Sequence, residues 1–309
     1  MKKSLKALSL VALVATTMTV QGKILRVNNV AGMAPYTSIQ AAVDASQDGD
    51  TIMVDGSTIA YEGVKLNKRL VLVGPGYFQK ENKIETVATM EAIVGGITVE
   101  TAGCTIIGMH VRGEDFCVAA PQTVITRCRK SSWGDFYFKE GADNCIIHQN
   151  FIGTIGRMWG TEPTSNHQIT NNIMSAVSFD WSGFRNSYIA YNTSSSDDRC
   201  AGGTSGCTYE HNLVGRWWND EDTENTYNDN FVFWDYSVDF RFADTDLEVY
   251  NRLNQSLPEG VTSTYGALAG DDPYVMSGIP AGPVIERLTV PASVEEGSKL
   301  NITIKLGQQ

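Results

Sequence analysis

A seven-residue motif that begins and ends with asparagine occurs three times in the middle of the chain. It occupies residues 144–150, 166–172 and 186–192, and each copy has isoleucine three residues before the closing asparagine. Weaker copies end at His110, Cys128, Asn212 and Asn230, and successive closing residues are 18, 22, 22, 20, 20 and 18 residues apart. A period near twenty is typical of a solenoid, in which each repeat buries its apolar face only against its neighbours.

The residue types of the motif indicate which solenoid the chain forms. They are β-branched and aromatic, they alternate with period two, and they carry no helical stripe. Asparagine suits a turn because it tolerates left-handed backbone angles, and amides stacked about 4.8 Å apart can hydrogen-bond along a ladder. Leucine-rich repeats have a similar period, but their leucine consensus is absent. The repeat therefore predicts an all-β, right-handed parallel β-helix of about eight coils.

The first 22 residues have the pattern of a secretory signal. Lys2, Lys3 and Lys6 precede a short apolar run over residues 8–14, and residues 20–22 offer a cleavage site. The run is too short to span a membrane permanently. We expect an exported protein with a mature chain that begins near Lys23 and is located in the periplasm, on the cell surface or outside the cell.

The charge of the chain limits its partners. The net charge is −11, and removal of residues 1–22, with three lysines and no acids, would make it −14. Such an acidic chain is a poor candidate for binding nucleic acid or inserting into an anionic membrane. It also disfavours unaided binding of a polyanion. An acidic surface that only keeps the protein soluble is the alternative, and the sequence leaves that alternative and the oligomeric state open.

The mature chain divides into a β-helix over residues 23–282 and a tail over 283–309. A capping-box pattern at 37–40 predicts a short helix that covers the open end of the first coil, and strands are expected at 51–54, 64–66 and 70–73. Residues 243–282 carry turn signals and are expected to wrap the C-terminal end. The tail alternates like two paired strands.

The first coils, the asparagine motifs and two later segments resemble the pectate-lyase-like β-helix superfamily. Residues 38–45, 49–52 and 63–74 resemble the opening of such proteins, and the asparagine motifs resemble their repeats. Residues 239–242 and 265–268 resemble the closing coil of secreted members. The resemblance covers roughly residues 36–270 and implies the fold. It leaves the activity open, because this fold carries lyases, hydrolases, epimerases and inert adhesins.

Between the motifs lie segments that form the glycan-facing groove in that superfamily. They are residues 133–139, 155–159, 177–181, 197–200 and 215–219, and they hold five of the six tryptophans. A row of aromatic residues could stack on sugar rings, although the same tryptophans could equally seal loops against the body. The candidate substrate-binding residues are Tyr137, Trp159, Trp181, Trp217 and Trp218.

Two kinds of cleavage chemistry are compatible with these segments. A lyase removes the proton next to a uronate carboxylate, and it needs a base and a cation. The candidate catalytic residues for that reaction are Lys139, Arg157, Asp180 and Arg199. The pair Asp197-Asp198 is similar to the acid pair of inverting hydrolases, but neighbours on a strand point to opposite faces, and the other hydrolase motifs are missing.

The remaining polar residues support weaker expectations. Asp220 and Asp222 could bind calcium in an acidic turn, or the turn could simply be solvated. The four histidines lack zinc spacing and are interpreted as structural or surface residues. Cysteines 104, 117, 128 and 145 are expected to be buried thiols, and Cys200 and Cys207 could form a disulfide. The sequence thus predicts a protein that binds and cleaves a polysaccharide that contains uronate, with a non-catalytic glycan-binding or adhesive surface protein as the alternative.

Overall fold

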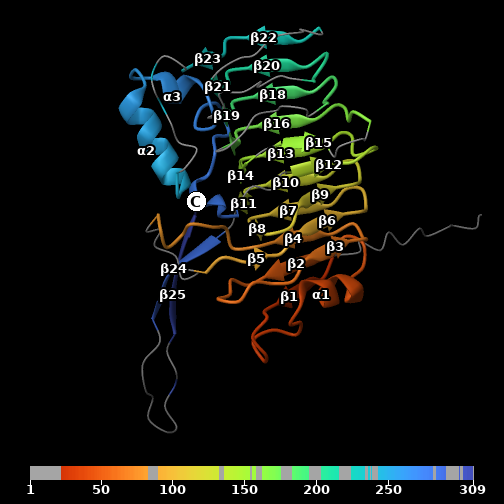
Figure 1. Ribbon diagram of the computed structural model, residues 1–309. Coiled ribbons are helices and arrows are strands. Elements are labelled where there is room, and N and C mark those ends of the chain that lie inside the picture. Colours follow the sequence, from red (N-terminus) through yellow and green to blue (C-terminus); the bar gives the residue numbers. More distant parts are fainter. Residues whose placement is uncertain are drawn as a thin grey trace, which may run out of the picture.

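The computed structural model shows a parallel β-solenoid of about seven turns, one fewer than the repeat predicts, with few helices (Figure 1). The structure describes residues 22–82, 90–131, 136–153, 155–157, 162–174, 183–194, 203–215, 224–233, 236, 238, 243–280, 283–289, 299 and 302–308. Within these ranges the coils stack their strands into three parallel sheets.

The longest sheet, sheet A, has ten strands in chain order. They are β1 (Ile24–Val27), β2 (Thr51–Val54), β4 (Val71–Val73), β7 (Thr105–Ile107), β10 (Val124–Thr126), β13 (Ile146–His148), β16 (Gln168–Thr170), β18 (Tyr188–Ala190), β20 (Thr208–Glu210) and β22 (Thr226–Asn228).

Sheet B and sheet C form the other two faces of the coils. Sheet B contains β5 (Ile93–Val94), β8 (His110–Arg112), β11 (Arg129–Ser131), β14 (Phe151–Ile152), β17 (Ile173–Met174), β19 (Thr193–Ser194), β21 (Leu213–Val214) and β23 (Phe231–Val232). Sheet C contains β3 (Val64–Leu66), β6 (Ile97–Val99), β9 (Phe116–Val118), β12 (Phe136–Phe138) and β15 (Ile155–Arg157).

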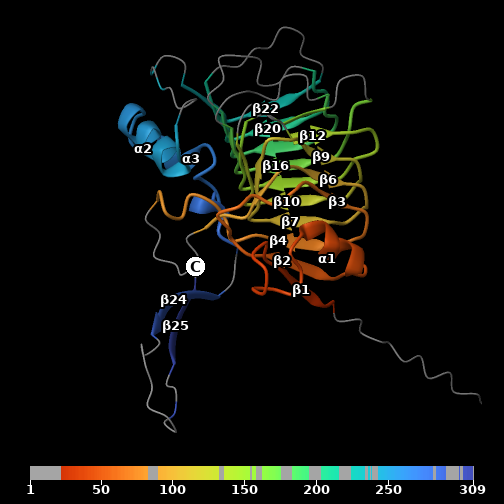
Figure 2. The ribbon, with the colours of Figure 1, turned by 60° about the horizontal axis from the view of Figure 1, so that its bottom comes forward.

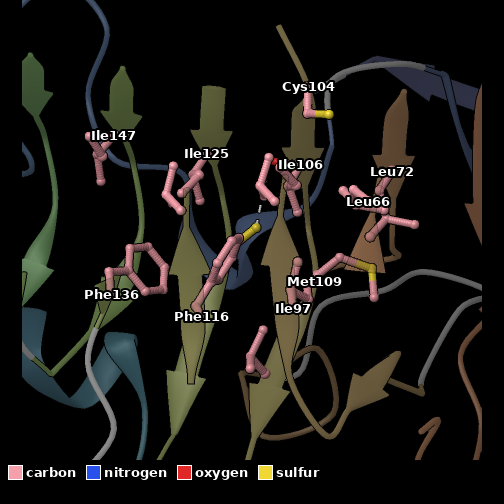
Figure 3. Close-up of a cluster of buried hydrophobic side chains, with 14 of the residues drawn as sticks. Leu66, Leu72, Ile97, Cys104, Ile106, Met109, Phe116, Ile125, Phe136 and Ile147 are labelled. Atoms are coloured by element: carbon pink, nitrogen blue, oxygen red, sulfur yellow. Dashed lines mark hydrogen bonds between the residues drawn. The ribbon is translucent and has the colours of Figure 1, made fainter. Parts of the chain in front are cut away.

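The core is a stack of apolar layers between the sheets. In sheet A the central residues of the motifs align across the strands, so that Ile147 is paired with Ile169 and Ile169 with Ile189, and all three are fully buried. Phe116 and Phe136 of sheet C approach from the opposite side, with ring centroids 4.6 Å apart (Figure 3). Alternation along each strand explains this, because every second residue points inward.

The closing asparagines form a buried ladder between sheets A and B. The backbone N–H of Asn150 donates to Asn172 Oδ1 at 2.9 Å, and the next two steps, to Asn192 and Asn212, have the same geometry at 3.0 and 2.9 Å. Each side-chain amide also donates to a strand carbonyl of the preceding coil, as from Asn172 Nδ2 to Ile147 O at 2.9 Å. The predicted ladder is therefore confirmed.

The left-handed residues are not the same asparagines. The opening residues Asn144, Asn166 and Asn186 have φ of 57°, 61° and 48°, as predicted. The closing asparagines are absent from the left-handed set. The residue before each of them takes the positive φ instead, for example Gln149 at 57° and Tyr191 at 53°.

Helix α1 (Ile39–Ala45) packs its buried residues Ile39, Ala42 and Val43 into the core beside β1, β2 and β3 (Figures 1 and 2). The predicted capping box is wrong in detail. Ser38 is the N-cap and accepts from Ala41 N at 3.1 Å. Gln40 does not return to the cap, because its Oε1 accepts from Lys65 N of β3 at 3.0 Å.

Residues 243–280 contain α2 (Asp246–Ser256), α3 (Val261–Thr264) and the short helix η2 (Met276–Gly278), where the sequence predicted only turns. Both helices α2 and α3 lie on the sheet B side (Figures 1 and 2). The strap, residues 265–279, then crosses the asparagine turns coil by coil. Its contacts run from Gly266 N, which donates to His211 O, to Ile279 O, which accepts from Arg127 Nη1, both at 2.8 Å.

A buried polar cluster fixes the strap to the coils. Asp246, at the start of α2, accepts hydrogen bonds from Tyr274 Oη, Ser277 N and Asn82 Nδ2 at 2.9, 2.7 and 2.6 Å. The Tyr274 hydroxyl also meets that of Tyr77, at 2.5 Å. Burial raises the pKa of the Asp246 carboxyl, and these hydrogen bonds oppose the rise. The cluster ties three segments that are distant in sequence.

The tail forms an antiparallel pair of strands. β24 (Pro283–Thr289) pairs with β25 (Thr303–Gln308), and the register shifts between Ile285 and Arg287. The pair projects from the body of the solenoid in both views (Figures 1 and 2).

Candidate functional site

The outer face of sheet C carries the predicted groove residues that the structure describes best. Tyr137 is the middle residue of β12, between Phe136 and Phe138, which are both fully buried. Alternation therefore places Tyr137 on the outer face, where it is half-buried. Register pairs it with Cys117 on one side and with Gly156 on the other.

Gly156 leaves room beside the Tyr137 ring position. A Cβ built on Gly156 would meet no heavy atom within 4 Å. Gly156 is itself buried, so glycine adds no side chain beside Tyr137 but does not expose the backbone of β15.

Lys139 lies just beyond β12, where its N–H donates to Val118 O at 2.9 Å. Its ammonium group contacts the Cys117 thiol. Burial raises the pKa of Cys117, whereas the charge and the hydrogen bond of Lys139 lower it, and Asp115 and Glu100 add smaller effects in the raising direction. The outer face at this point thus combines a phenol, an ammonium group, a thiol and two carboxylates.

Arg157 ends β15 in register with Phe138, one position beyond the pairing of Tyr137 with Gly156. Its backbone therefore lies on the strand next to Tyr137, and its side chain is outside the described part of the structure. The other predicted site residues also lie outside it. They are Trp159, Asp180, Trp181, Arg199, Trp217, Trp218, Asp220 and Asp222.

The histidines make structural contacts. His110 Nδ1 hydrogen-bonds to Glu91 Oε2, and the Arg129 guanidinium lies 3.6 Å from the other oxygen of that carboxylate and 3.7 Å from the centre of the Phe78 ring. Burial lowers the pKa of His110. His148 Nε2 lies 3.1 Å from Asp272 Oδ2 on the strap. These contacts agree with the interpretation of the histidines as structural.

The cysteine predictions can be compared with the structure for five of the six residues. Cys104, Cys117, Cys128 and Cys145 are buried free thiols, as predicted. Cys207 is also free and buried, and is therefore not bonded to Cys200.

The described ranges contain no cluster of candidate metal ligands and no helix that could span a membrane. No group of three or more His, Cys, Asp or Glu residues there could hold a metal ion. No helix there is long and apolar enough to cross a bilayer. The calcium prediction at Asp220 and Asp222 concerns residues beyond those ranges and stays a prediction.

Sequence reasoning missed the contact between Cys117 and Lys139. The two residues belong to different coils, and only the register of β9 against β12 brings them together. The available signal was the strand pattern of residues 115–118, which was interpreted only as a place for a small buried side chain.

Comparison of the chain with family models, with curated proteins and with solved structures finds no match.

Proposed function

We propose that the chain is an exported, pectate-lyase-like β-helix protein that binds an extracellular polysaccharide containing uronate on the outer face of sheet C. One observation carries the proposal: Tyr137 lies on the outer face in register with Cys117 and Gly156, and the charge and a hydrogen bond of Lys139 act on the Cys117 thiol beside it. An aromatic ring can pack on a sugar ring, and an ammonium group can pair with its carboxylate.

Cleavage by β-elimination is the reaction that these residue types would serve. It needs a cation beside the uronate carboxylate and a base at the neighbouring carbon. Lys139 fits the first role. Arg157 on the adjacent strand, and Asp180 and Arg199 later in the sequence, are the candidates for the second. Catalysis would require these four side chains to lie within reach of one bound uronate.

Non-catalytic glycan binding is the second candidate function. The carboxylates near Lys139 favour it, because Asp115 and Glu100, which act on the same thiol as Lys139, offset part of the ammonium charge before a substrate arrives. Such a cation can hold a glycan carboxylate, but it stabilises a developing carbanion less well.

The test compares mature chains with Tyr137→Ala, Lys139→Ala and, as the matched control, Lys80→Ala. Lys80 is an exposed lysine that lies outside the strands of sheet C. Binding is measured against polygalacturonate, and cleavage is measured from unsaturated-uronate absorbance and new reducing ends. We expect at least tenfold weaker binding in the two groove variants only. Equal binding by all four chains would refute the proposal.

The same proposal includes finer features of the fold. We infer that the solenoid is right-handed and that α1 is its N-terminal cap, as in the superfamily that the sequence resembles. If the turn with Asp220 and Asp222 binds calcium, a chelator should lower the melting temperature, and the double alanine variant should not respond. An unchanged parent melting temperature would identify a solvated turn.

A further inference from the structure

A single tyrosine lies on the outer face of sheet A. Among the outward residues of the ten strands, which are small, aliphatic or polar, Tyr188 in β18 is the only phenylalanine, tyrosine or tryptophan. Its exposed fraction is 38%. It lies on a different face from the groove residue Tyr137, which belongs to sheet C.

The Tyr188 ring is held in place by the next coil. Its hydroxyl donates to Glu210 Oε2 in β20 at 2.7 Å. Burial and the Glu210 carboxylate together raise the pKa of Tyr188 to about 12, so the phenol remains a hydrogen-bond donor at neutral pH. A ring that is already ordered loses little conformational entropy when a ligand packs on it.

Hydrogen-bonding groups surround this ring. Gln168, exposed in β16, and Thr208 in β20 flank Tyr188 in register, one coil on either side. Glu210 Oε1 accepts no hydrogen bond from any residue in the described ranges, and His211 Nδ1 is 3.9 Å away from it. The site therefore has an aromatic face, an amide, a hydroxyl and a free carboxylate oxygen.

The negative charge of Glu210 next to Tyr188 favours a neutral sugar over a uronate. Glu210 is one-third exposed, and Tyr188 hydrogen-bonds to it directly. A uronate that packed on the Tyr188 ring would bring a second carboxylate close to that of Glu210 and be repelled. A neutral sugar has an apolar C–H face for the ring and hydroxyl groups for the carboxylate and the amide, as small-ligand sites require.

We propose that Tyr188, with Glu210 and Gln168, forms a second glycan-binding site on sheet A, and that this site takes neutral sugar residues. The site is separate from the sheet C surface and does not depend on the function proposed there. A chain with both sites would bind neutral and acidic polysaccharide on different faces.

The experiment uses affinity electrophoresis of the mature chain in gels that contain neutral galactan, neutral xyloglucan or polygalacturonate. The variants are Tyr188→Ala, Tyr188→Phe and Glu210→Gln. Tyr250→Ala is the matched control, because Tyr250 on α2 has the same exposed fraction of 38%. The melting temperature of each variant is measured to confirm that it folds.

We expect at least one neutral gel to retard the parent and the Tyr250→Ala chain. Tyr188→Ala should bind at least tenfold more weakly, whereas Tyr188→Phe, which keeps the ring, should lose less. Binding to polygalacturonate should not change in any of these variants. The proposal is overturned if neither neutral gel retards the parent, if Tyr188→Ala binds like the parent, or if Tyr188→Ala weakens only the binding of polygalacturonate.

Discussion

Between Asn166 and Asn230, each coil has two turns built on the same local rule, one before and one after its sheet A strand. In both turns a residue with positive φ is followed by a residue whose side chain accepts a backbone N–H of the preceding coil. After the strand, the accepting residue is always asparagine from Asn150 to Asn230. Before the strand, it changes from coil to coil. The successive acceptors there are His167 Nδ1, Ser187 Oγ, Cys207 Sγ and Asn225 Oδ1.

The two turns differ in the hydrogen bonds that the accepting side chain makes. After the strand, asparagine both accepts from a backbone N–H and donates to a strand carbonyl, as Asn192 Nδ2 does to Ile169 O at 2.8 Å. The amide offers these two groups on separate atoms. Before the strand, the feature that the side chains share is an acceptor, which imidazole, hydroxyl, thiol or amide can supply, and some of them also donate, as Ser187 Oγ does to Arg185 O at 2.9 Å.

The positive-φ residues of the two turns also differ. Before the strand most of them tolerate left-handed angles, such as Asn144 and Gly206, and Gln122 and Glu224 are the exceptions. After the strand they include Tyr191 and His211, which are unusual there. The strap lies along this second turn, and Asn171 Nδ2 donates to its Ala267 and Ala269 carbonyls at 3.1 and 2.9 Å. Where the strap covers the turn, contact with the strap outweighs backbone preference.

The largest expected effect comes from a charge in the strand that links the two turns. Ile169 is fully buried between Ile147 and Ile189, so Ile169→Asp would bury a carboxylate with no partner and should prevent stable folding. Gln168→Asp, on the exposed neighbour, should melt like the parent. Soluble yield and thermal melting provide the measurement, and a heat-stable Ile169→Asp chain would refute the register.

The next two variants compare the ladder after the strand, formed by the closing asparagines, with the ladder before the strand, formed by His167, Ser187, Cys207 and Asn225. Asn172→Ala removes an oxygen that accepts from Asn150 N and Nδ2 and an amide that donates to Ile147 O and Asn192 Oδ1, all at 2.9 Å. Each buried group left unpaired costs about 1–3 kcal/mol, so the free energy of unfolding should fall by about 3 kcal/mol or more.

Ser187→Ala is the matched variant in the other ladder. It removes one accepted bond, from His167 N, and one donated bond, to Arg185 O. Chemical denaturation should show a loss of about 1–2 kcal/mol. Equal losses for Ser187→Ala and Asn172→Ala would mean that the two ladders contribute alike, contrary to the count of their hydrogen bonds.

These two ladders show how far sequence reasoning can go. The asparagine ladder was predictable because one residue type repeats at a fixed interval. The other ladder was not, because His167, Ser187 and Cys207 share a geometry and no chemical type. The strap was missed for a similar reason: its anchors Gln149 and Asn171 were visible only as ordinary polar residues within the motifs, and contacts distant in sequence leave no local pattern.

The candidate site was predictable only in part. The resemblance predicted that residues 133–139 face the groove, and Tyr137 does lie on the outer face of β12. The partners that define its environment come from other coils, and their alignment depends on turn lengths that composition does not reveal. In the sequence, Arg157 and Arg199 each follow a closing asparagine by seven residues, and Trp159 and Trp181 each follow one by nine. This equal spacing predicts that they align on one face, and that alignment stays a prediction.

The ladder before the strand contains a histidine, so its contribution to stability, unlike that of the asparagine ladder, depends on pH. His167, the imidazole member of the varied ladder, packs between Phe138 and Phe184, with ring centroids 5.2 and 4.9 Å away. Burial lowers its pKa from 6.5 to about 4. The unfolded chain therefore binds this proton more readily than the folded chain does. Stability from His167 is present above pH 6.5 and is lost as the pH falls towards 4, by about 3 kcal/mol.

His167→Asn is the variant that isolates this effect, because an amide supplies an acceptor and does not titrate in this range. Unfolding by urea at pH 7 and at pH 4.5 provides the measurement. The parent should lose more stability between the two values than the variant does, by about 2–3 kcal/mol. Identical losses would show that His167 protonates without cost in the folded coil.

The smallest effect concerns Tyr191, the bulkiest left-handed residue of the covered turn. Its ring stacks on His211 at 5.1 Å and packs against Gly270 of the strap. Tyr191→Asn repeats the residue found one coil earlier, at Asn171, so it relieves backbone strain while it loses the stacking energy of about 0.5–1.5 kcal/mol. Tyr191→Val loses the same stacking and adds a β-branched residue at φ 53°. Valine should therefore be less stable than asparagine by about 1–2 kcal/mol in chemical denaturation. If the two variants unfold alike, the strap and not the backbone angle determines which residues this turn accepts.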